Sequence, residues 1–244
     1  MRTGDVLADR FEIERLAEKG GMGTVFRARD LTTGQPVALK VLHAFAMSDA
    51  SRLVREAHAL MKLRHPSVVR YVDHGLLADD RPYLAMEWLD GEDLRQRVRR
   101  QELRMSDAIA LGYRVAEALA HAHEVDIVHR DVKPSNIFLL GGQAAQVKLI
   151  DFGVARVPEP SRDATAHGAV LGTIAYMAPE QARGAREVTP AADIFSLGCV
   201  MFECATGKRA FSGDDVMAVL AKVLITDLPR AREINPKVPR ALDR

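Results

Sequence analysis

The chain has 244 residues, of which 48% are hydrophobic and 27% are charged. This length is enough for one large domain or two small lobes with a sizeable core, so neither size nor composition excludes a soluble enzyme. Its 34 Lys and Arg against 33 Asp and Glu leave a formal net charge of +1, so no global field attracts nucleic acid or an anionic membrane.

The first 90 residues are predicted to form mainly strands. Runs of alternating apolar residues, separated by Gly, Asp and Thr, occupy 11–16, 23–30, 36–42, 68–76 and 83–88. The T-T-G-Q-P segment at 32–36 is a strong hairpin signal. Residues 51–63 carry apolar side chains at three- and four-residue steps, which predicts a helix. This part is therefore expected to be an antiparallel sheet with one helix.

After Gly91 the pattern changes to helix. Ser106 is the predicted N-cap of a long helix that runs through His123. A second helix, at 191–205, is apolar nearly all round, as expected for a helix at the centre of a lobe. We therefore expect a two-lobed α+β fold, with a small N-lobe at about 1–86, a hinge at about 87–93 and a larger, mainly helical C-lobe at about 94–244.

Weaker signals bear on other classes of protein. The Arg-rich stretch at 95–100 has acidic neighbours, which is typical of a solvated helix face and not of a nucleic-acid site. Cys199 and Cys204, the only cysteines, lie in one apolar stretch, so a disulfide framework is not expected. No charged-then-apolar leader opens the sequence and no run of 18 apolar residues follows, so we expect neither a signal peptide nor a membrane span, and a reduced cytoplasm.

Two motifs near the start suggest phosphate binding. In G-G-M-G-T-V at 20–25, backbone N–H groups can approach phosphates that a side chain would hold off. Alone, such a glycine cluster is also typical of an ordinary turn. V-A-L-K at 37–40 ends a strand with Lys40, which can equally be a solvent-facing residue of that strand.

The segment H-R-D-V-K-P-S-N at 129–136 is the strongest single signal. Asp131 and Asn136 are five residues apart, so one loop can place both side chains at one phosphate. D-F-G at 151–153 follows the apolar run V-K-L-I, and a strand-end aspartate is a natural ligand for Mg²⁺, which prefers carboxylate oxygens. A-P-E at 178–180 completes the series.

These five motifs, in this order, resemble the signature set of the protein kinases. Over essentially its whole length the chain is similar to serine/threonine kinases, and most of all to the eukaryotic-like, or Hanks-type, kinases of bacteria. The resemblance implies a two-lobed kinase fold and transfer of the ATP γ-phosphate to Ser and Thr hydroxyls of proteins. It implies Mg²⁺ as the cofactor, with Mn²⁺ as the alternative. The expected partners are protein substrates, without nucleic acid or membrane, and a homodimer for trans-autophosphorylation stays open.

The resemblance assigns roles residue by residue. The expected catalytic residues are Asp131 as the base, Lys133 at the γ-phosphate, Lys40 at the α- and β-phosphates, and Glu56 as the ion-pair partner of that lysine. The expected nucleotide contacts are Gly20, Gly21, Gly23, Val25, Ala38, Lys40, Glu87, Leu89, Asp93 and Phe138, with Met86 as the gatekeeper. The expected metal ligands are Asn136 and Asp151. For Val25, Ala38 and Phe138 a plain core role, and for Asp93 a plain surface role, are the alternatives.

Residues 151–180 resemble an activation segment. Arg130 implies the class in which a phosphorylated residue on this segment pairs with that arginine and orders it. Thr165 is the expected phosphorylation site and Ser161 the weaker candidate. Thr173 is expected to hydrogen-bond Asp131 and Lys133 and to shape the acceptor site. Asp193 is expected to anchor the catalytic-loop backbone near His129.

The chain departs from the family pattern in three places. Glu18 stands where the first glycine of the loop is usual, and His167 where a second phosphorylated threonine is often found. The sequence stops at Arg244, about one turn into a helix expected to begin at Pro239. The family continues with two helices and an arginine that pairs with Glu180, so we expect a C-terminally truncated domain in which this glutamate lacks its partner.

Two other functions stay open. A pseudokinase, or nucleotide-binding scaffold, is suggested by Glu18 and by the early end of the sequence. The intact residues Lys40, Glu56, Asp131, Asn136 and Asp151 argue against it. A small-molecule kinase of related fold is disfavoured by the A-P-E and G-T-I-A-Y-M segments, which serve protein acceptors. Similar bacterial proteins carry sensor or membrane segments beyond this domain, so a membrane-anchored longer form stays open too.

Overall fold

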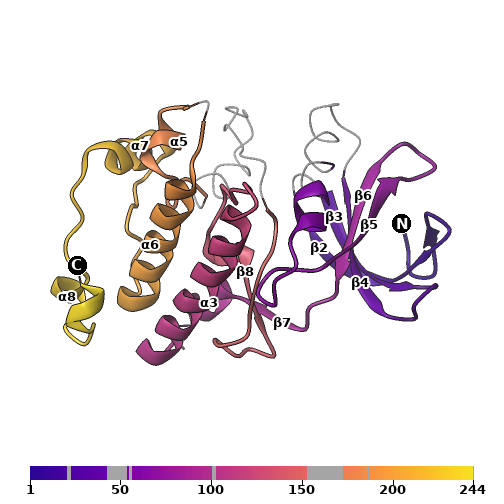
Figure 1. Cartoon of the computed structure of the whole chain (residues 1–244), viewed down its shortest axis with the longest axis horizontal. Helices are drawn as coiled ribbons and strands as arrows, with labels where there is room; N and C mark the ends of the chain where they lie inside the picture. Colours follow the sequence, from indigo (N-terminus) through magenta and orange to yellow (C-terminus); the bar gives the residue numbers. More distant parts are fainter. Residues whose placement is uncertain are drawn as a thin grey trace. The chain divides into compact units, whose positions relative to one another are not determined.

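The computed structural model describes residues 1–20, 23–42, 54, 57–100, 103–152, 173–185 and 187–243. The chain divides into two compact units (Figure 1). Unit 1 comprises Met1–Arg64 and Val68–Asp90, and unit 2 comprises His65–Ser67 and Gly91–Arg244. The short segment at 65–67 therefore belongs to unit 2, although unit 1 flanks it on both sides.

Unit 1 is built on a six-stranded antiparallel sheet with strand order β1-β2-β3-β4-β6-β5. Its strands are β1 (Val6–Leu7), β2 (Phe11–Lys19), β3 (Gly23–Asp30), β4 (Pro36–Leu42), β5 (Tyr71–Leu76) and β6 (Pro82–Glu87). All five predicted strands occur, and β3 and β4 have the predicted bounds. Strand β2 extends beyond residue 16 because its pairing with β3 continues to Lys19. Residues 57–62 are helical.

One face of this sheet carries the core of unit 1. Leu39 of β4 is fully buried and is paired with Phe26 of β3 and Ala85 of β6, so an apolar row crosses three strands. Burial of each large apolar side chain stabilises the fold by about 1.5–3 kcal/mol. Lys40 and Val25, which are paired with each other, lie on the opposite face because successive side chains of a strand alternate.

A buried carboxylate fixes the hairpin between β3 and β4. Asp30 is 1% exposed and forms a two-pronged ion pair with Arg10, at 2.9 Å from Nε and 2.8 Å from an Nη atom. Arg10 also bonds Asp73 at 2.8 Å, and the backbone N–H of Thr32 donates to Asp30 at 3.0 Å. The hydrogen bond from Arg10 holds the pKa of Asp30 far below its usual range, against the opposing effect of burial. Gly34, with φ of 71°, completes the turn.

Unit 2 is mainly helical, with a small three-stranded antiparallel sheet of order β7-β8-β9. Its strands are β7 (Gly91–Asp93), β8 (Ile137–Leu140) and β9 (Val147–Leu149). Its α-helices are α2 (Leu94–Arg99), α3 (Met105–His123), α5 (Pro179–Ala182), α6 (Pro190–Thr206), α7 (Val216–Ile225) and α8 (Ala231–Ile234), and two 3-10 turns are η1 (Pro134–Asn136) and η2 (Arg240–Leu242). The two longest helices, α3 and α6, pack against each other (Figure 1).

The start of α3 differs from the prediction. Ser106 is not the N-cap: the helix begins at Met105, and the capping position is Arg104. Arg104 makes no side-chain cap bond, but its Nε lies 3.0 Å from a carboxylate oxygen of Asp107 in the first turn. The N–H groups of Asp107 and Ala108 both donate to the carbonyl of Arg104 at 3.0 Å, so the helical hydrogen bonding already begins at that residue. The predicted end at His123 is confirmed.

Helix α6 is the central helix of unit 2. It begins with Pro190, whose missing N–H costs nothing at a helix start, and ends at Thr206, where Gly207, with φ of 71°, caps it. Cys199 and Cys204 are free thiols on this helix, and burial raises the pKa of each to about 12. Among the helices in the described ranges, none has both the length and the apolar composition that crossing a bilayer requires.

Candidate active site

One buried carboxylate anchors the backbone of the loop at 129–136 through hydrogen bonds. Asp193, in the first turn of α6, is fully buried and accepts hydrogen bonds from the backbone N–H groups of His129 and Arg130, at 2.8 and 2.7 Å. The Nε2 atom of His123 lies 2.8 Å from the same carboxylate. Arg130 has φ of 66°, a conformation that side chains disfavour, so these bonds hold the loop in a shape that it would not keep alone.

Asp131 lies at the centre of a polar network in this loop. Its Oδ2 atom accepts hydrogen bonds from Lys133 Nζ at 2.7 Å and from Asn136 Nδ2 at 3.0 Å. Lys133 Nζ also donates to Thr173 Oγ1 at 3.1 Å. The side chain of Asp131 is 29% exposed, and within the described residues its second oxygen, Oδ1, accepts no hydrogen bond. A proton acceptor with this arrangement has one oxygen fixed and the other accessible.

The turn η1 places Asn136 beside the end of β9. The amide Nδ2 of Asn136 donates to both the backbone and the side chain of Asp131, so its Oδ1 atom is turned away from that residue. Within the described part of the chain, the Oδ1 atom of Asn136 receives only a long contact of 3.4 Å, from Ser135. The carbonyl of Asn136 accepts from the N–H of Ile150 at 3.0 Å, which brings Asp151 to the same edge. A carboxylate and an amide oxygen form a hard donor set that fits Mg²⁺.

The residues that follow β9 pack into unit 2. Phe152 is buried, and its ring centroid lies 4.5 Å from that of His129. The Nε2 atom of His129 lies 3.2 Å from the carbonyl oxygen of Ile150. Asp151 has φ of 54°, so the chain turns sharply between the strand and the buried ring. The carboxylate of Asp151 is therefore carried on a turn whose two sides are packed.

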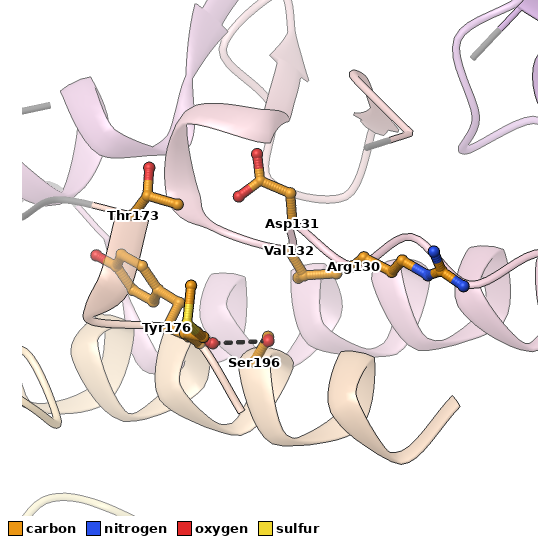
Figure 2. A pocket seen from close by; sticks show the side chains of 7 residues that line it. Arg130, Asp131, Val132, Thr173, Tyr176 and Ser196 are labelled. Atoms are coloured by element: carbon orange, nitrogen blue, oxygen red, sulfur yellow. Dashed lines mark hydrogen bonds between the residues drawn. The ribbon is translucent and has the colours of Figure 1, made fainter. Parts of the chain in front are cut away.

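A small pocket opens beside Asp131 in unit 2 (Figure 2). It is lined by Arg130, Asp131, Val132, Thr173, Tyr176, Met177 and Ser196. The side chains of Arg130 and Asp131 leave the loop in different directions (Figure 2). Ser196 Oγ donates to the carbonyl of Tyr176 at 2.7 Å, and the Tyr176 hydroxyl donates to Glu203. Burial raises the pKa of Tyr176, so the pocket keeps a neutral phenol at physiological pH.

The predicted phosphate-binding residues of unit 1 share one face of the sheet. Lys40 pairs with Val25 across β4 and β3, and Val25 pairs with Glu18 across β3 and β2. Directly paired residues point to the same side, so Glu18 lies on the face that carries Lys40. The turn closes through a 2.9 Å bond from Gly20 N–H to the carbonyl of Gly23. A Cβ atom at Gly23 would lie 2.5 Å from a backbone oxygen of β4, so only glycine fits there.

The predicted base-binding residues are distributed over both units. In unit 1, Ala38 pairs with Met86, and Glu87 at the end of β6 donates its N–H to the carbonyl of Arg70 at 2.9 Å. Leu89 is half-buried in the segment that follows β6. In unit 2, Asp93 pairs with Phe138 across β7 and β8.

The carboxylate of Asp93 is occupied within its own segment. It caps α2 by accepting from the Gln96 N–H at 2.8 Å, and it pairs with Arg95 at 3.2 Å. A ribose contact would compete with both interactions. The helix cap is therefore a sufficient physical reason for an aspartate at this position.

Several predicted residues lie outside the described part of the chain: Gly21, Glu56, Thr165 and the alternative site Ser161. Glu180 lies in the first turn of α5, and among the described residues no cationic side chain forms an ion pair with it. Two supporting residues were missed by the sequence reasoning. The side-chain amide of Gln181 donates a hydrogen bond to the carbonyl of Arg130 at 3.0 Å, and His123 hydrogen-bonds Asp193. Neither residue belongs to a sequence motif that would have indicated this role.

Comparison with known proteins identifies the family. A family model described as "Protein kinase domain" matches residues 11–241. The serine/threonine-protein kinase PrkC of Bacillus subtilis is 35% identical over 247 residues, which cover 100% of this chain and 37% of PrkC. The serine/threonine-protein kinase PknB of Mycobacterium leprae is 40% identical over 226 residues, which cover 90% of this chain and 36% of PknB. The chain thus spans little more than a third of the length of these curated relatives.

A solved structure supports the same assignment. The crystal structure of the Mycobacterium tuberculosis PknI kinase domain matches with a TM-score of 0.76 and 26% identity, covering 100% of this chain and 87% of that one. The predicted α+β, kinase-like fold class is therefore confirmed. With the motif series placed along the fold and these matches over nearly the whole sequence, the chain belongs to the protein kinase family, as a catalytic domain of the Hanks-type bacterial serine/threonine class.

Proposed function

We propose that the chain transfers the γ-phosphate of ATP to Ser or Thr hydroxyls of proteins. The observation that carries this proposal is the network in which Lys133 Nζ bridges Asp131 Oδ2 and Thr173 Oγ1, at 2.7 and 3.1 Å. It fixes one oxygen of a partly exposed carboxylate, leaves the other accessible, and puts a cation next to it. This is what a base needs when it must accept a hydroxyl proton beside an anionic phosphoryl group.

In the proposed reaction, the acceptor hydroxyl donates a hydrogen bond to Asp131 Oδ1. A bond forms from the hydroxyl oxygen to the γ-phosphorus while the bond from that phosphorus to the ADP oxygen breaks, and the hydroxyl proton passes to Asp131. Lys133 offsets negative charge on the transferring oxygens. Thr173, bonded to this lysine, borders the pocket and shapes the acceptor side.

Asn136 and Asp151 would hold the divalent cation. A divalent cation bound there would supply positive charge that offsets the charge of the nucleotide phosphates. The donor set of one amide and one carboxylate oxygen suits Mn²⁺ as well. Among the described residues no group of three or more His, Cys, Asp and Glu side chains converges on a point, so phosphate and water are the expected remaining ligands.

In unit 1, we assign Lys40 to the α- and β-phosphates, with Glu56 as its partner, and Val25 and Ala38 to the base. Lys40, Val25 and Ala38 share one face of the sheet, which supports this assignment. We further propose that a phosphate on Thr165 pairs with Arg130. A cytoplasmic location and a homodimer for trans-autophosphorylation stay predictions.

The test is a phosphotransfer assay with radiolabelled ATP, Mg²⁺ and a generic basic protein substrate. Replacing Asp131 by Asn should lower turnover by about 10²–10⁴-fold, the usual contribution of a general base. The matched control is Asp126→Asn, which makes the same chemical change at an exposed residue of the same connection and should leave turnover unchanged. Nucleotide binding without transfer by the parent chain would favour the pseudokinase, and equal turnover of parent and Asp131→Asn would remove the base assignment.

A further inference from the structure

The single tryptophan of the chain lies under two arginines. Trp88 directly follows β6 and is half-buried. The guanidinium carbons of Arg15, from β2, and Arg27, from β3, lie over its ring at 5.1 and 5.5 Å from the centroid. The indole Nε1 donates to Asp90 Oδ1 at 2.7 Å. The ring is therefore held at its edge and covered by two cations, a geometry in which Trp is the strongest aromatic partner.

The repulsion between the two guanidinium groups is offset by a neighbouring carboxylate. Arg27 Nη1 lies 2.5 Å from Glu14 Oε2, and Arg29 Nε lies 3.6 Å from the other oxygen of the same carboxylate. Arg27 is thus charge-paired while it covers the indole. We call Glu14, Arg15, Arg27 and Trp88 the Trp88 cluster.

The sheet register places this cluster in line with the predicted base-binding residues. Arg15 pairs with Arg27, Arg27 pairs with Ala38, and Ala38 pairs with Met86. These four residues form one row across β2, β3, β4 and β6 on one face of the sheet. Trp88 comes two residues after the end of this row. Its side chain therefore connects the two strands that flank the glycine turn to the segment that follows β6.

We propose that Trp88 is a positioning residue for the adenine subsite. Arg15 and Arg27 hold its indole, and the indole in turn sets where the backbone of 87–89 stands relative to β2 and β3. The inference rests on the proposed function, since it assumes that ATP binds on this face of the sheet. Loss of the ring would let the 87–89 segment and the β2–β3 hairpin move independently, so the affinity for the base would fall while the chemistry at Asp131 would not.

The test compares Trp88→Leu, which removes the ring, with Trp88→Phe, which keeps a weaker one. We expect Trp88→Leu to raise KM for ATP by about five- to tenfold, with kcat at saturating ATP changed by less than about twofold, and Trp88→Phe to recover part of the affinity. Arg27→Gln should raise KM by a smaller factor and add nothing further to Trp88→Leu. The matched control is Tyr113→Leu, since Arg114 lies over that exposed ring at 5.7 Å in α3; its KM should equal that of the parent.

Two further readouts separate this mechanism from its rivals. Titration with adenosine, ADP and ATP should show the same fold loss in Trp88→Leu for all three ligands. A loss that grows with the number of phosphates would overturn the proposal, because it would mean that the arginines act on the phosphates directly. In Arg15→Gln and Arg27→Gln, the fluorescence of the sole tryptophan should become more accessible to a neutral quencher.

The failure of this inference differs from the failure of the proposed function. If the parent chain binds and transfers phosphate from ATP, but Trp88→Leu has an unchanged KM and an unchanged adenosine affinity, the positioning role is wrong and the kinase activity stands. If the parent binds neither ATP nor adenosine in a calorimetric titration, both the proposed function and the positioning role of Trp88 are wrong. A lower melting temperature with unchanged KM in Trp88→Leu would show a purely structural role.

Discussion

Replacement of Asp193 by Asn tests how much of the catalytic loop depends on one buried charge. The carboxylate accepts three hydrogen bonds, from the N–H groups of His129 and Arg130 and from His123 Nε2, at 2.8, 2.7 and 2.8 Å. Asn has the same shape but one acceptor oxygen. With that oxygen turned toward His129 and His123, its NH₂ group faces the N–H of Arg130, and that donor is left without a partner.

The cost follows from these three bonds. Loss of the negative charge weakens the two retained bonds by about 1 kcal/mol each, because charge-assisted bonds are roughly twice as strong as neutral ones. Stranding the buried N–H of Arg130 costs about 1–3 kcal/mol more. The total is about 3–5 kcal/mol. Because the φ of 66° at Arg130 is a strained conformation, the loop backbone should also leave it once the hydrogen bond is lost.

Amide hydrogen exchange of the peptide that covers 128–133 measures this effect locally. We expect exchange at Arg130 to accelerate by about a hundredfold or more in Asp193→Asn, since 1.4 kcal/mol corresponds to tenfold. Urea unfolding should show a lower midpoint as well. The control is Asp126→Asn, an exposed aspartate of the same connection, for which neither quantity should change. Unchanged protection at Arg130 would refute the argument that Asp193 holds the loop.

Two other substitutions test what stabilises each unit: the buried Asp30–Arg10 ion pair in unit 1 and the β7–β8 pairing in unit 2. Asp30→Asn should destabilise unit 1 by about 2–3 kcal/mol at neutral pH, somewhat less than the about 3–5 kcal/mol of a broken buried ion pair because Arg10 keeps a second partner. Since the pKa of Asp30 is depressed far below its usual range in the folded state, its stabilisation is complete above about pH 4 and is lost progressively as the pH falls from there toward the folded-state pKa, so the difference between the urea midpoints of parent and variant should narrow in acid; a difference that is as large at pH 2 as at pH 7 would contradict this. Gly91→Ala should cost about 2 kcal/mol or more, because φ is 150° and a Cβ would lie 2.0 Å from a carbonyl oxygen of β8; a melting temperature equal to that of the parent would show that the β7–β8 pairing adapts.

The strands and the central helix were predictable because their signals are local. Strands β3 and β4 have the predicted bounds, and α6 differs from its prediction by one residue at each end. Their alternation or all-round apolar pattern reflects burial directly. Strands β7 and β8 were not predicted, because β7 has three residues and pairs with a segment far along the chain. Such pairing leaves little trace in either segment alone.

The candidate site was predictable where motifs are contiguous. The loop at 129–136 brings Asp131, Lys133 and Asn136 together through its own turn, so their spacing indicates their proximity. The supports from other elements were not predictable. His123 and Gln181 reach the site from α3 and α5, and nothing in their local sequence distinguishes them from ordinary helix residues. Register, which the sequence pattern does not specify across strands, was needed to align Arg15 and Arg27 with Ala38.

The three residues at 65–67 have a consequence for how this protein is made. Unit 1 surrounds them in sequence, yet the carbonyl of Ser67 accepts from the N–H of Leu149 at 2.8 Å, and the ring of His65 stacks on that of His121 at 5.4 Å. During synthesis these residues leave the ribosome long before α3 and β9 exist. Their partners arrive only when most of unit 2 has been translated. No single cleavage of the chain therefore separates the two units completely. A protein made of residues 1–90 alone would contain the segment 65–67 without Leu149 and His121, which it contacts in unit 2.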